Sequence, residues 1–137
     1  MMSAPMPAIA AFYAGLIGII LIILAMPISA LRRRLKAGIG DGGDPRLARA
    51  IRAHANTVEW ALPTLLLLVL AELNRAPPLL LHICGIALVA GRVVHAVGLS
   101  STSGASRGRV AGTALTWVAL MVLAIWDIWA FARLALV

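Results

Sequence analysis

The sequence contains few charged, aromatic and cysteine residues. Of its 137 residues 12% are charged and 5% are aromatic, and acidic side chains number five. The single cysteine, Cys84, cannot form an internal disulfide, and no Cys/His spacing typical of a metal site is present. Because so few aromatic side chains are available for base stacking, the formal charge of +7 is not interpreted as a nucleic-acid surface.

Two familiar sequence elements are also missing. The glycine-rich segment 38–43 is not followed by the Lys-Ser/Thr pair of a phosphate-binding loop. Residues 1–7 carry no lysine or arginine, and the first basic cluster comes after the first apolar run instead of before it. That order is wrong for a cleaved signal peptide and is expected for a retained membrane span.

Apolar residues are abundant and are concentrated in long runs. They make up 62% of the chain, against about 45–50% in soluble domains. A helix that crosses a bilayer needs about 20 mostly apolar residues. Four segments meet this requirement: residues 8–31, 45–73, 79–99 and 110–134. The sequence therefore predicts an all-α, integral membrane four-helix bundle that forms a single domain over residues 1–137.

The basic residues predict the orientation of this bundle. The link between the first two spans and the start of the second carry Arg32, Arg33, Arg34, Lys36, Arg46, Arg49 and Arg52. The link between the last two spans adds Arg107 and Arg109, whereas Arg75 and Arg133 lie at the other end. Because cytoplasmic loops are rich in arginine and lysine, we expect both basic links in the cytoplasm and both termini on the non-cytoplasmic side.

Polar residues at similar depth in neighbouring spans form a candidate site. In the second span Arg52, Asn56 and Glu59 share one helical face. Arg92 and His95 lie in the cytoplasmic half of the third span, and the fourth span begins with basic residues. An ionisable group inside a membrane costs roughly 2.5–3.5 kcal/mol, so each requires a partner.

Two interpretations of these residues remain open. Glu59 could form a buried ion pair with Arg52 or Arg92 that holds the helices together. Alternatively, the excess of arginine over acid at this level favours an anionic ligand, because uncompensated cations are costly in a low dielectric. Arginine forks suit carboxylates and phosphates.

Three segments resemble signatures of the MAPEG family (membrane-associated proteins in eicosanoid and glutathione metabolism). They are residues 52–59 (RAHANTVE) with Pro63, residues 91–95 (GRVVH) and residues 109–112 (RVAG). The resemblance covers nearly the whole chain and is strongest to the bacterial inner-membrane, YecN-like branch.

The resemblance implies a multi-pass protein of the bacterial inner membrane that forms a homotrimer. It implies that glutathione, a co-substrate, binds between neighbouring subunits near the cytoplasmic face, with no metal. The implied activity is that of a glutathione transferase or peroxidase, which conjugates or reduces lipophilic electrophiles. Partners would be the lipid bilayer, glutathione, a lipophilic small molecule and other copies of the chain, but no nucleic acid.

The resemblance also implies roles for individual residues. Glutathione would be held by Arg52, Asn56, Glu59, His95, Arg92 and Arg32. Arg109 would be the catalytic residue, because a cation beside the sulfur favours the nucleophilic thiolate. The preceding loop differs in length from the family pattern, so Arg107 is a substitute for Arg109.

The sequence departs from the family pattern at catalytic positions. Ala55, Leu99, Thr113 and Val110 stand where some members have arginine, tyrosine, tyrosine and serine, respectively. The alternative is therefore a non-catalytic MAPEG-fold protein that binds lipid or glutathione. An unrelated small transporter is a third hypothesis, although its polar groups would be expected at the midplane and between inverted repeats.

Overall fold

The chain folds into four helices in the computed structural model, which describes residues 6–101, 104 and 106–135. The helices are α1 (Ala8–Leu35), α2 (Pro45–Leu73), α3 (Pro78–Ser101) and α4 (Arg107–Ala135). All four are long and apolar enough to cross a membrane, and no strand occurs among the described residues. The chain is thus an all-helical membrane protein.

The helix bounds differ from the predicted spans in α1, α3 and α4, by one or two residues at each end of α3 and by more in the other two. α2 has the predicted bounds, whereas α1 continues beyond residue 31 through its arginines to Leu35. α4 begins at Arg107 and not at residue 110, because Ser106 caps it: the Ser106 Oγ accepts the N–H of Arg109 at 3.3 Å. Hydropathy locates the part of a helix that lies in lipid, and caps locate its ends.

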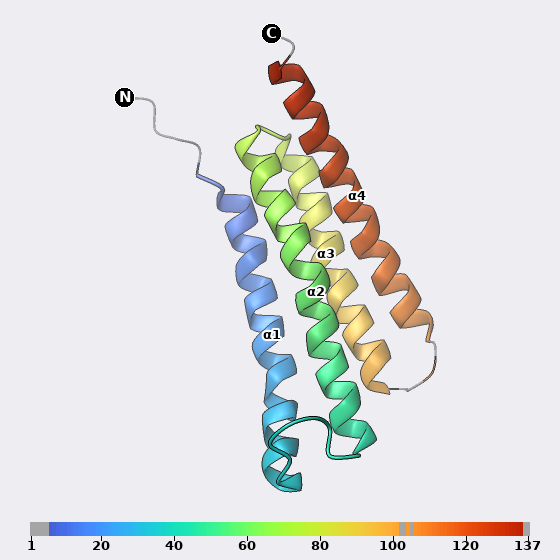
Figure 1. Cartoon of the computed structure of the whole chain (residues 1–137). Helices are drawn as coiled ribbons and strands as arrows, with labels where there is room; N and C mark the ends of the chain where they lie inside the picture. Colours follow the sequence, from blue (N-terminus) through green and yellow to red (C-terminus); the bar gives the residue numbers. More distant parts are fainter. Residues whose placement is uncertain (1–5, 102–103, 105, 136–137) are drawn as a thin grey trace.

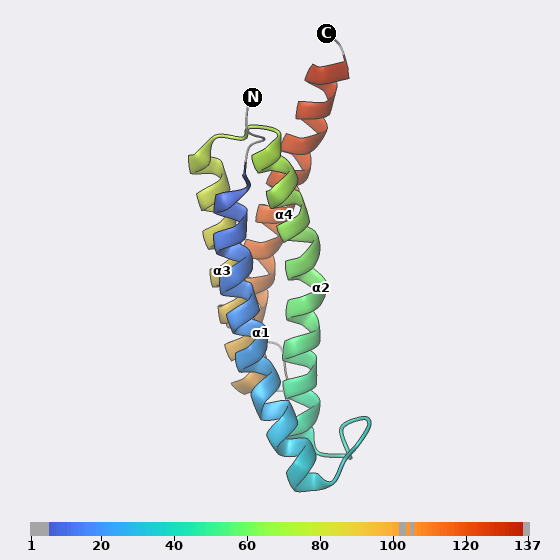
Figure 2. The same cartoon turned by 90° about the vertical axis from the view of Figure 1, so that its left-hand side faces the viewer.

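α2 and α3 form the middle of the bundle, with α1 and α4 on either side (Figures 1 and 2). α1 packs against α2 and α3, and α4 packs against the same pair, but the described parts of α1 and α4 do not touch each other. The start of α1, the α2–α3 turn and the end of α4 share one end of the bundle (Figure 1). The α1–α2 loop and the start of α4 lie at the opposite end, which we call the basic end.

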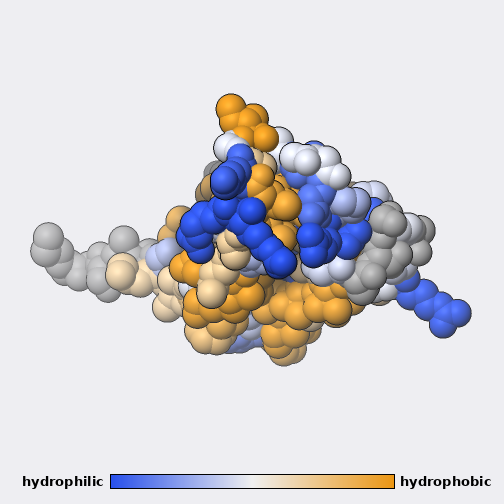
Figure 3. Space-filling view, turned by 90° about the horizontal axis from the view of Figure 1, so that it is seen from below, coloured by the Kyte–Doolittle hydropathy of each residue, from blue (hydrophilic) through white to orange (hydrophobic). Residues whose placement is uncertain are grey.

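Hydrophilic residues gather on the basic end, whereas the sides of the bundle are largely hydrophobic (Figure 3). Many large apolar side chains are exposed along the helices, among them Ile22, Leu66, Val118 and Ile128. In water such a surface would aggregate, but in a bilayer it faces lipid chains. The described structure therefore matches the requirements of a membrane span.

The α1–α2 loop is held by short-range polar contacts at the basic end. The Asp44 carboxylate caps α2 by accepting the N–H of Arg46 at 2.8 Å and forms a 2.7 Å ion pair with the same residue. These bonds stabilise the charged carboxylate and hold the pKa of Asp44 well below its usual range. Arg32 donates to the carbonyl oxygens of Ala37 and Gly38, at 3.2 and 2.9 Å.

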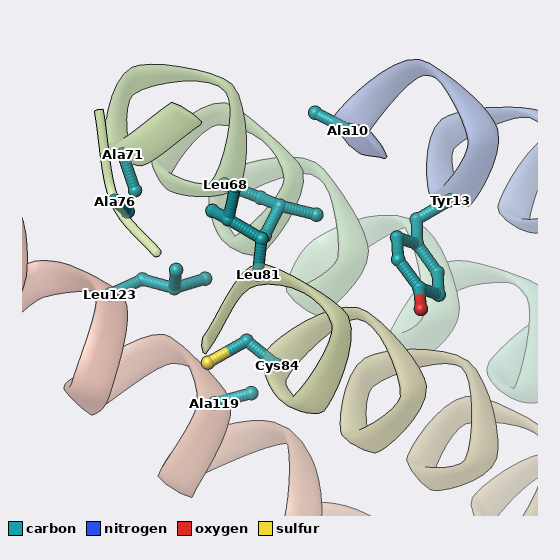
Figure 4. Close-up of a cluster of buried hydrophobic side chains, with 9 residues drawn as sticks. All are labelled: Ala10, Tyr13, Leu68, Ala71, Ala76, Leu81, Cys84, Ala119 and Leu123. Atoms are coloured by element: carbon teal, nitrogen blue, oxygen red, sulfur yellow. The ribbon is translucent and has the colours of Figure 1, made fainter. Parts of the chain in front are cut away.

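The end opposite the basic end contains a core of mostly small side chains (Figure 4). Its buried members are Ala10, Tyr13, Leu68, Ala71, Ala76, Leu81, Cys84, Ala119 and Leu123. Glu72 of α2 caps α1 here, because its two carboxylate oxygens accept the N–H groups of Ile9 and Ala10 at 3.0 and 2.7 Å. This acid is thus paired with the positive end of the α1 dipole.

Glycines set a close approach between α3 and α4. A Cβ added to Gly112 of α4 would lie 2.5 Å from the carbonyl oxygen of Gly91 and 2.6 Å from the backbone nitrogen of His95. A Cβ on Gly98 would lie 2.8 Å from the backbone nitrogen of Arg109. Small residues that let backbones approach closely are typical of helix contacts in membranes.

We predict that Gly112→Ala destabilises the protein by about 1–3 kcal/mol, since the methyl group must push α3 and α4 apart. Thermal unfolding in detergent measures this. Gly15→Ala is the matched control, because nothing lies within 4 Å of a Cβ at that position. The control should leave stability unchanged or raise it by up to about 1 kcal/mol. Equal stability of the two variants would contradict the close approach.

Candidate functional site

A buried arginine joins three helices near the basic end. Arg92 of α3 is 0% exposed. Its Nε donates to the Thr116 Oγ1 of α4 at 3.0 Å, and its Nη2 donates to the carbonyl oxygen of Gly112 at 3.1 Å. Its Nη1 donates to the Asn56 Oδ1 of α2 at 3.0 Å. The guanidinium therefore fixes the position of the Asn56 side chain relative to α3 and α4.

No carboxylate neutralises Arg92 among the described residues. Of the two ion pairs considered above, Glu59 forms the one with Arg52, at 3.8 Å and with both side chains exposed, and not the one with Arg92. The acceptors of Arg92 are neutral oxygens. Hydrogen bonds reduce the cost of burying a cation but do not cancel its charge. The region around Arg92 consequently retains a positive potential that favours an anion nearby.

A pocket of about 270 Å³ lies beside these hydrogen bonds and shares Asn56 with them. We call it the cationic pocket. Its walls come from α2, α3 and α4 and comprise Ala48, Arg49, Arg52, Asn56, His95, Leu99 and Arg109. Three of these residues are arginines and none is acidic. The pocket is thus suited to an anion of small size.

Two residues that line the cationic pocket, His95 and Arg109, offer hydrogen-bonding groups. His95 is 6% exposed, and its buried Nδ1 has no hydrogen-bond partner among the described residues. Arg109 is half-buried and donates through Nη1 to the carbonyl oxygen of Gly104 at 2.7 Å. A buried ring nitrogen without a partner is a feature that a bound ligand or water could satisfy.

A second pocket, of about 400 Å³, adjoins the first and is largely apolar. It shares His95 and Arg109 with the cationic pocket, and its other walls are Val110, Thr113, Ala114 and Trp117 of α4. The Trp117 ring packs against Trp60 of α2 with centroids 5.6 Å apart. An anionic and an apolar compound could therefore meet at His95 and Arg109.

The outer face of α2 presents charge to its surroundings. The side chains of Arg52 and Glu59 are 62% and 53% exposed, and their closest atoms lie 3.8 Å apart. Glu59 is at the middle of α2, where an ionised group facing lipid costs about 2.5–3.5 kcal/mol. This face requires a cover of ligand or protein.

The structure brings part of the predicted glutathione site together. Arg52, Asn56, His95 and Arg109 line the cationic pocket, whereas Glu59 lies one turn beyond it. Three other predicted residues do not line it: Arg92 lies behind Asn56, Arg32 binds its own loop, and Arg107 is exposed. Arg49 was missed, although its position one turn before Arg52 on the same face could have revealed it.

No group of three or more His, Cys, Asp and Glu side chains that could hold a metal occurs in the described part of the chain. The chain is thus a four-helix membrane protein with a cationic pocket at one end. The model of the MAPEG family matches residues 10–129, and the chain belongs to this family.

The chain is also similar to two bacterial inner membrane proteins. It is 35% identical to inner membrane protein YecN of Escherichia coli strain K12 over 121 residues, which are 88% of this chain and 91% of that protein. The same values hold for inner membrane protein YecN of Escherichia coli O6:H1 strain CFT073.

We predict that Thr116→Val destabilises the protein by about 1–3 kcal/mol, because the Nε–H of Arg92 loses its buried acceptor. Thr64→Val is the matched control. Both hydroxyls donate to the carbonyl oxygen four residues earlier, but only the Thr116 hydroxyl also accepts a bond from an arginine. Thermal unfolding of the pair measures the difference, and equal losses would argue against a stabilising role for the Arg92 bond.

Proposed function

We propose that this protein is a membrane-bound glutathione transferase, with peroxidase activity toward lipid hydroperoxides, and that its site is the cationic pocket with the adjoining apolar pocket. The observation that carries the proposal is that the two pockets share His95 and Arg109. One pocket suits a hydrophilic anion and the other a lipophilic compound. A transferase that joins a soluble thiol to a membrane-soluble electrophile needs both.

The chemistry of glutathione matches the side chains of the cationic pocket and its rim. The tripeptide has two carboxylates, one ammonium group and a thiol. Arg52 and His95 would hold carboxylates, Asn56 an amide or carboxylate, and Glu59 the ammonium group. The uncompensated charge of Arg92 adds a favourable potential for the anion without direct contact.

The reaction would take place between the two pockets. Arg109 would stabilise the thiolate, since a nearby cation lowers a thiol pKa. The sulfur then attacks an electrophilic carbon held in the apolar pocket, and the leaving group departs with its bonding electrons. With a hydroperoxide the sulfur attacks the outer oxygen, the O–O bond breaks, and the alkoxide takes up a proton and leaves as the alcohol. The thiol of a second glutathione then attacks the sulfenic sulfur, which forms glutathione disulfide and releases water.

We further propose that the working unit is a homotrimer in a bacterial inner membrane, with the basic end in the cytoplasm. Support comes from the exposed Arg52 and Glu59, because a neighbouring subunit would cover this charged face and complete the site. The positive-inside rule favours the cytoplasm for the basic end. Both termini would then lie on the non-cytoplasmic side.

We predict that Arg52→Ala weakens glutathione binding about 10-fold or more, because a charge-assisted bond to a carboxylate contributes roughly 1.5–3 kcal/mol. Calorimetry on the purified protein in detergent measures the affinity. Arg33→Ala is the control, because Arg33 is exposed at the same end and does not line the cationic pocket. Unchanged affinity in Arg52→Ala would remove this residue from the site.

We predict that Arg109→Ala raises the thiol pKa of bound glutathione by about 1 and lowers turnover of chlorodinitrobenzene. Thiolate absorbance against pH measures the first effect, and product absorbance measures the second. Arg107→Ala removes the same charge two residues away, from an exposed side chain outside both pockets. A shift in Arg107→Ala alone would transfer the catalytic role to Arg107.

The same assays separate the enzyme from its alternative, a MAPEG-fold protein that binds lipid or glutathione without catalysis. Leu99 and Thr113 near the pockets supply no tyrosine hydroxyl, which is the feature that favours this alternative. Binding of glutathione without turnover of either substrate would favour the alternative. Absence of binding would reject both.

A further inference from the structure

A separate pocket of about 770 Å³ lies at the end of the bundle opposite the basic end. Its lining comes from the α2–α3 turn and the last turns of α4. These two segments lie at the same end of the bundle (Figure 1). Its lining combines apolar walls with hydrogen-bond donors and comprises Leu73, Asn74, Arg75, Pro77, Trp126, Trp129, Ala130 and Arg133. We call it the distal pocket. The site described above does not use any of these residues.

Aromatic stacking positions one of the two arginines of the distal pocket. The Arg133 guanidinium lies over the Trp129 ring, 4.8 Å from its centroid. The Trp129 ring in turn packs against Trp126, with centroids 4.8 Å apart. A cation over an indole face keeps its outer N–H groups available to an anion.

The second arginine, Arg75, occupies a backbone position that favours glycine. It has φ of 60° and ends α2 in a Schellman motif, in which its N–H bonds the carbonyl oxygen of Glu72 and the N–H of Ala76 bonds that of Ala71. A side chain in this left-handed region is strained, and such strain at a pocket suggests a functional reason for the residue. Arg75 would supply charge that glycine cannot.

The distal pocket has an excess of positive charge. Neither Arg75 nor Arg133 forms an ion pair within the described parts of the chain. Asp127 is the nearest acid along α4, and the Asn74 amide donates to its Oδ1 at 3.4 Å. Asp127 does not line the pocket, and Glu72 at the same end is bound to the start of α1, so the lining itself contains two cations and no acid.

We propose that the distal pocket binds the phosphate of an anionic phospholipid, with the phosphate between Arg75 and Arg133 and an acyl chain along the apolar walls. Arginine forks suit phosphate oxygens, and the site lies where membrane-spanning helices end, at headgroup level. Leu73, Trp129 and Ala130 give the pocket an apolar side that a soluble anion would not need. Lipid bound here would join the α2–α3 turn to α4.

Quenching of tryptophan fluorescence by brominated lipid tests the proposal at this site alone. The chain has four tryptophans, at positions 60, 117, 126 and 129. In a Trp60→Phe/Trp117→Phe background, the remaining reporters both line the distal pocket. The protein is reconstituted with mixtures of phosphatidylcholine and brominated phosphatidylglycerol, and the relative binding constant of the two lipids is measured.

We expect phosphatidylglycerol to be preferred, and the preference to fall about fivefold for each of Arg75→Gly and Arg133→Gln. Arg75→Gly should also raise the melting temperature, because glycine adopts the left-handed conformation without strain. Loss of lipid preference together with a gain in stability separates binding from a structural role. The control variant Lys36→Gly/Arg33→Gln removes the same charge at the basic end. It also relieves Lys36 (φ 53°), the other non-glycine residue with positive φ in the described part of the chain, and it should keep the preference.

Three outcomes would overturn the proposal. The first is equal quenching by brominated phosphatidylglycerol and brominated phosphatidylcholine in the parent background. The second is an unchanged preference in the Arg75→Gly/Arg133→Gln variant. The third is displacement of the lipid by millimolar inorganic phosphate, which would assign the pocket to a soluble phosphate compound.

Discussion

The hydrogen bonds of Arg92 are the interaction on which the rest of the basic end depends. One guanidinium binds Asn56 of α2 and both Thr116 and Gly112 of α4, so three of the helices share a single buried donor group. In a membrane, where apolar side chains gain little by leaving lipid, such bonds and close backbone packing hold helices together. The same group determines where Asn56 lies and makes the neighbouring pocket attractive to anions.

The close glycine contacts between α3 and α4 position the two residues that both pockets share. Gly112 brings α4 against the backbone of His95 in α3, and Gly98 brings α3 against the backbone of Arg109 in α4. His95 and Arg109 are the two residues that both pockets share. A wider helix crossing would separate them and would divide the polar from the apolar pocket. Packing in this region therefore has a direct consequence for the proposed chemistry.

The sequence predicts the four spans and the face of α2 well, because hydropathy and helical period depend on local residues alone. It offered Glu59 as an internal partner of Arg92 but could not predict the actual partners, Asn56, Thr116 and Gly112, since these depend on how α4 is rotated against α3. Arg32 is a similar case, because its partners are carbonyl oxygens of a loop whose path is not evident from the sequence. Arg49 shows the opposite error: its spacing from Arg52 was visible, but the family signature does not include it.

The bond between Glu72 and the start of α1 bears on how the chain enters the membrane. The first N–H groups of α1 have no partner within that helix, and their acceptor comes from the far end of α2. During synthesis α1 must wait for the next 37 residues after its own last residue, Leu35, before this carboxylate exists. The first two helices are therefore expected to become a stable hairpin together, before α3 and α4 are added.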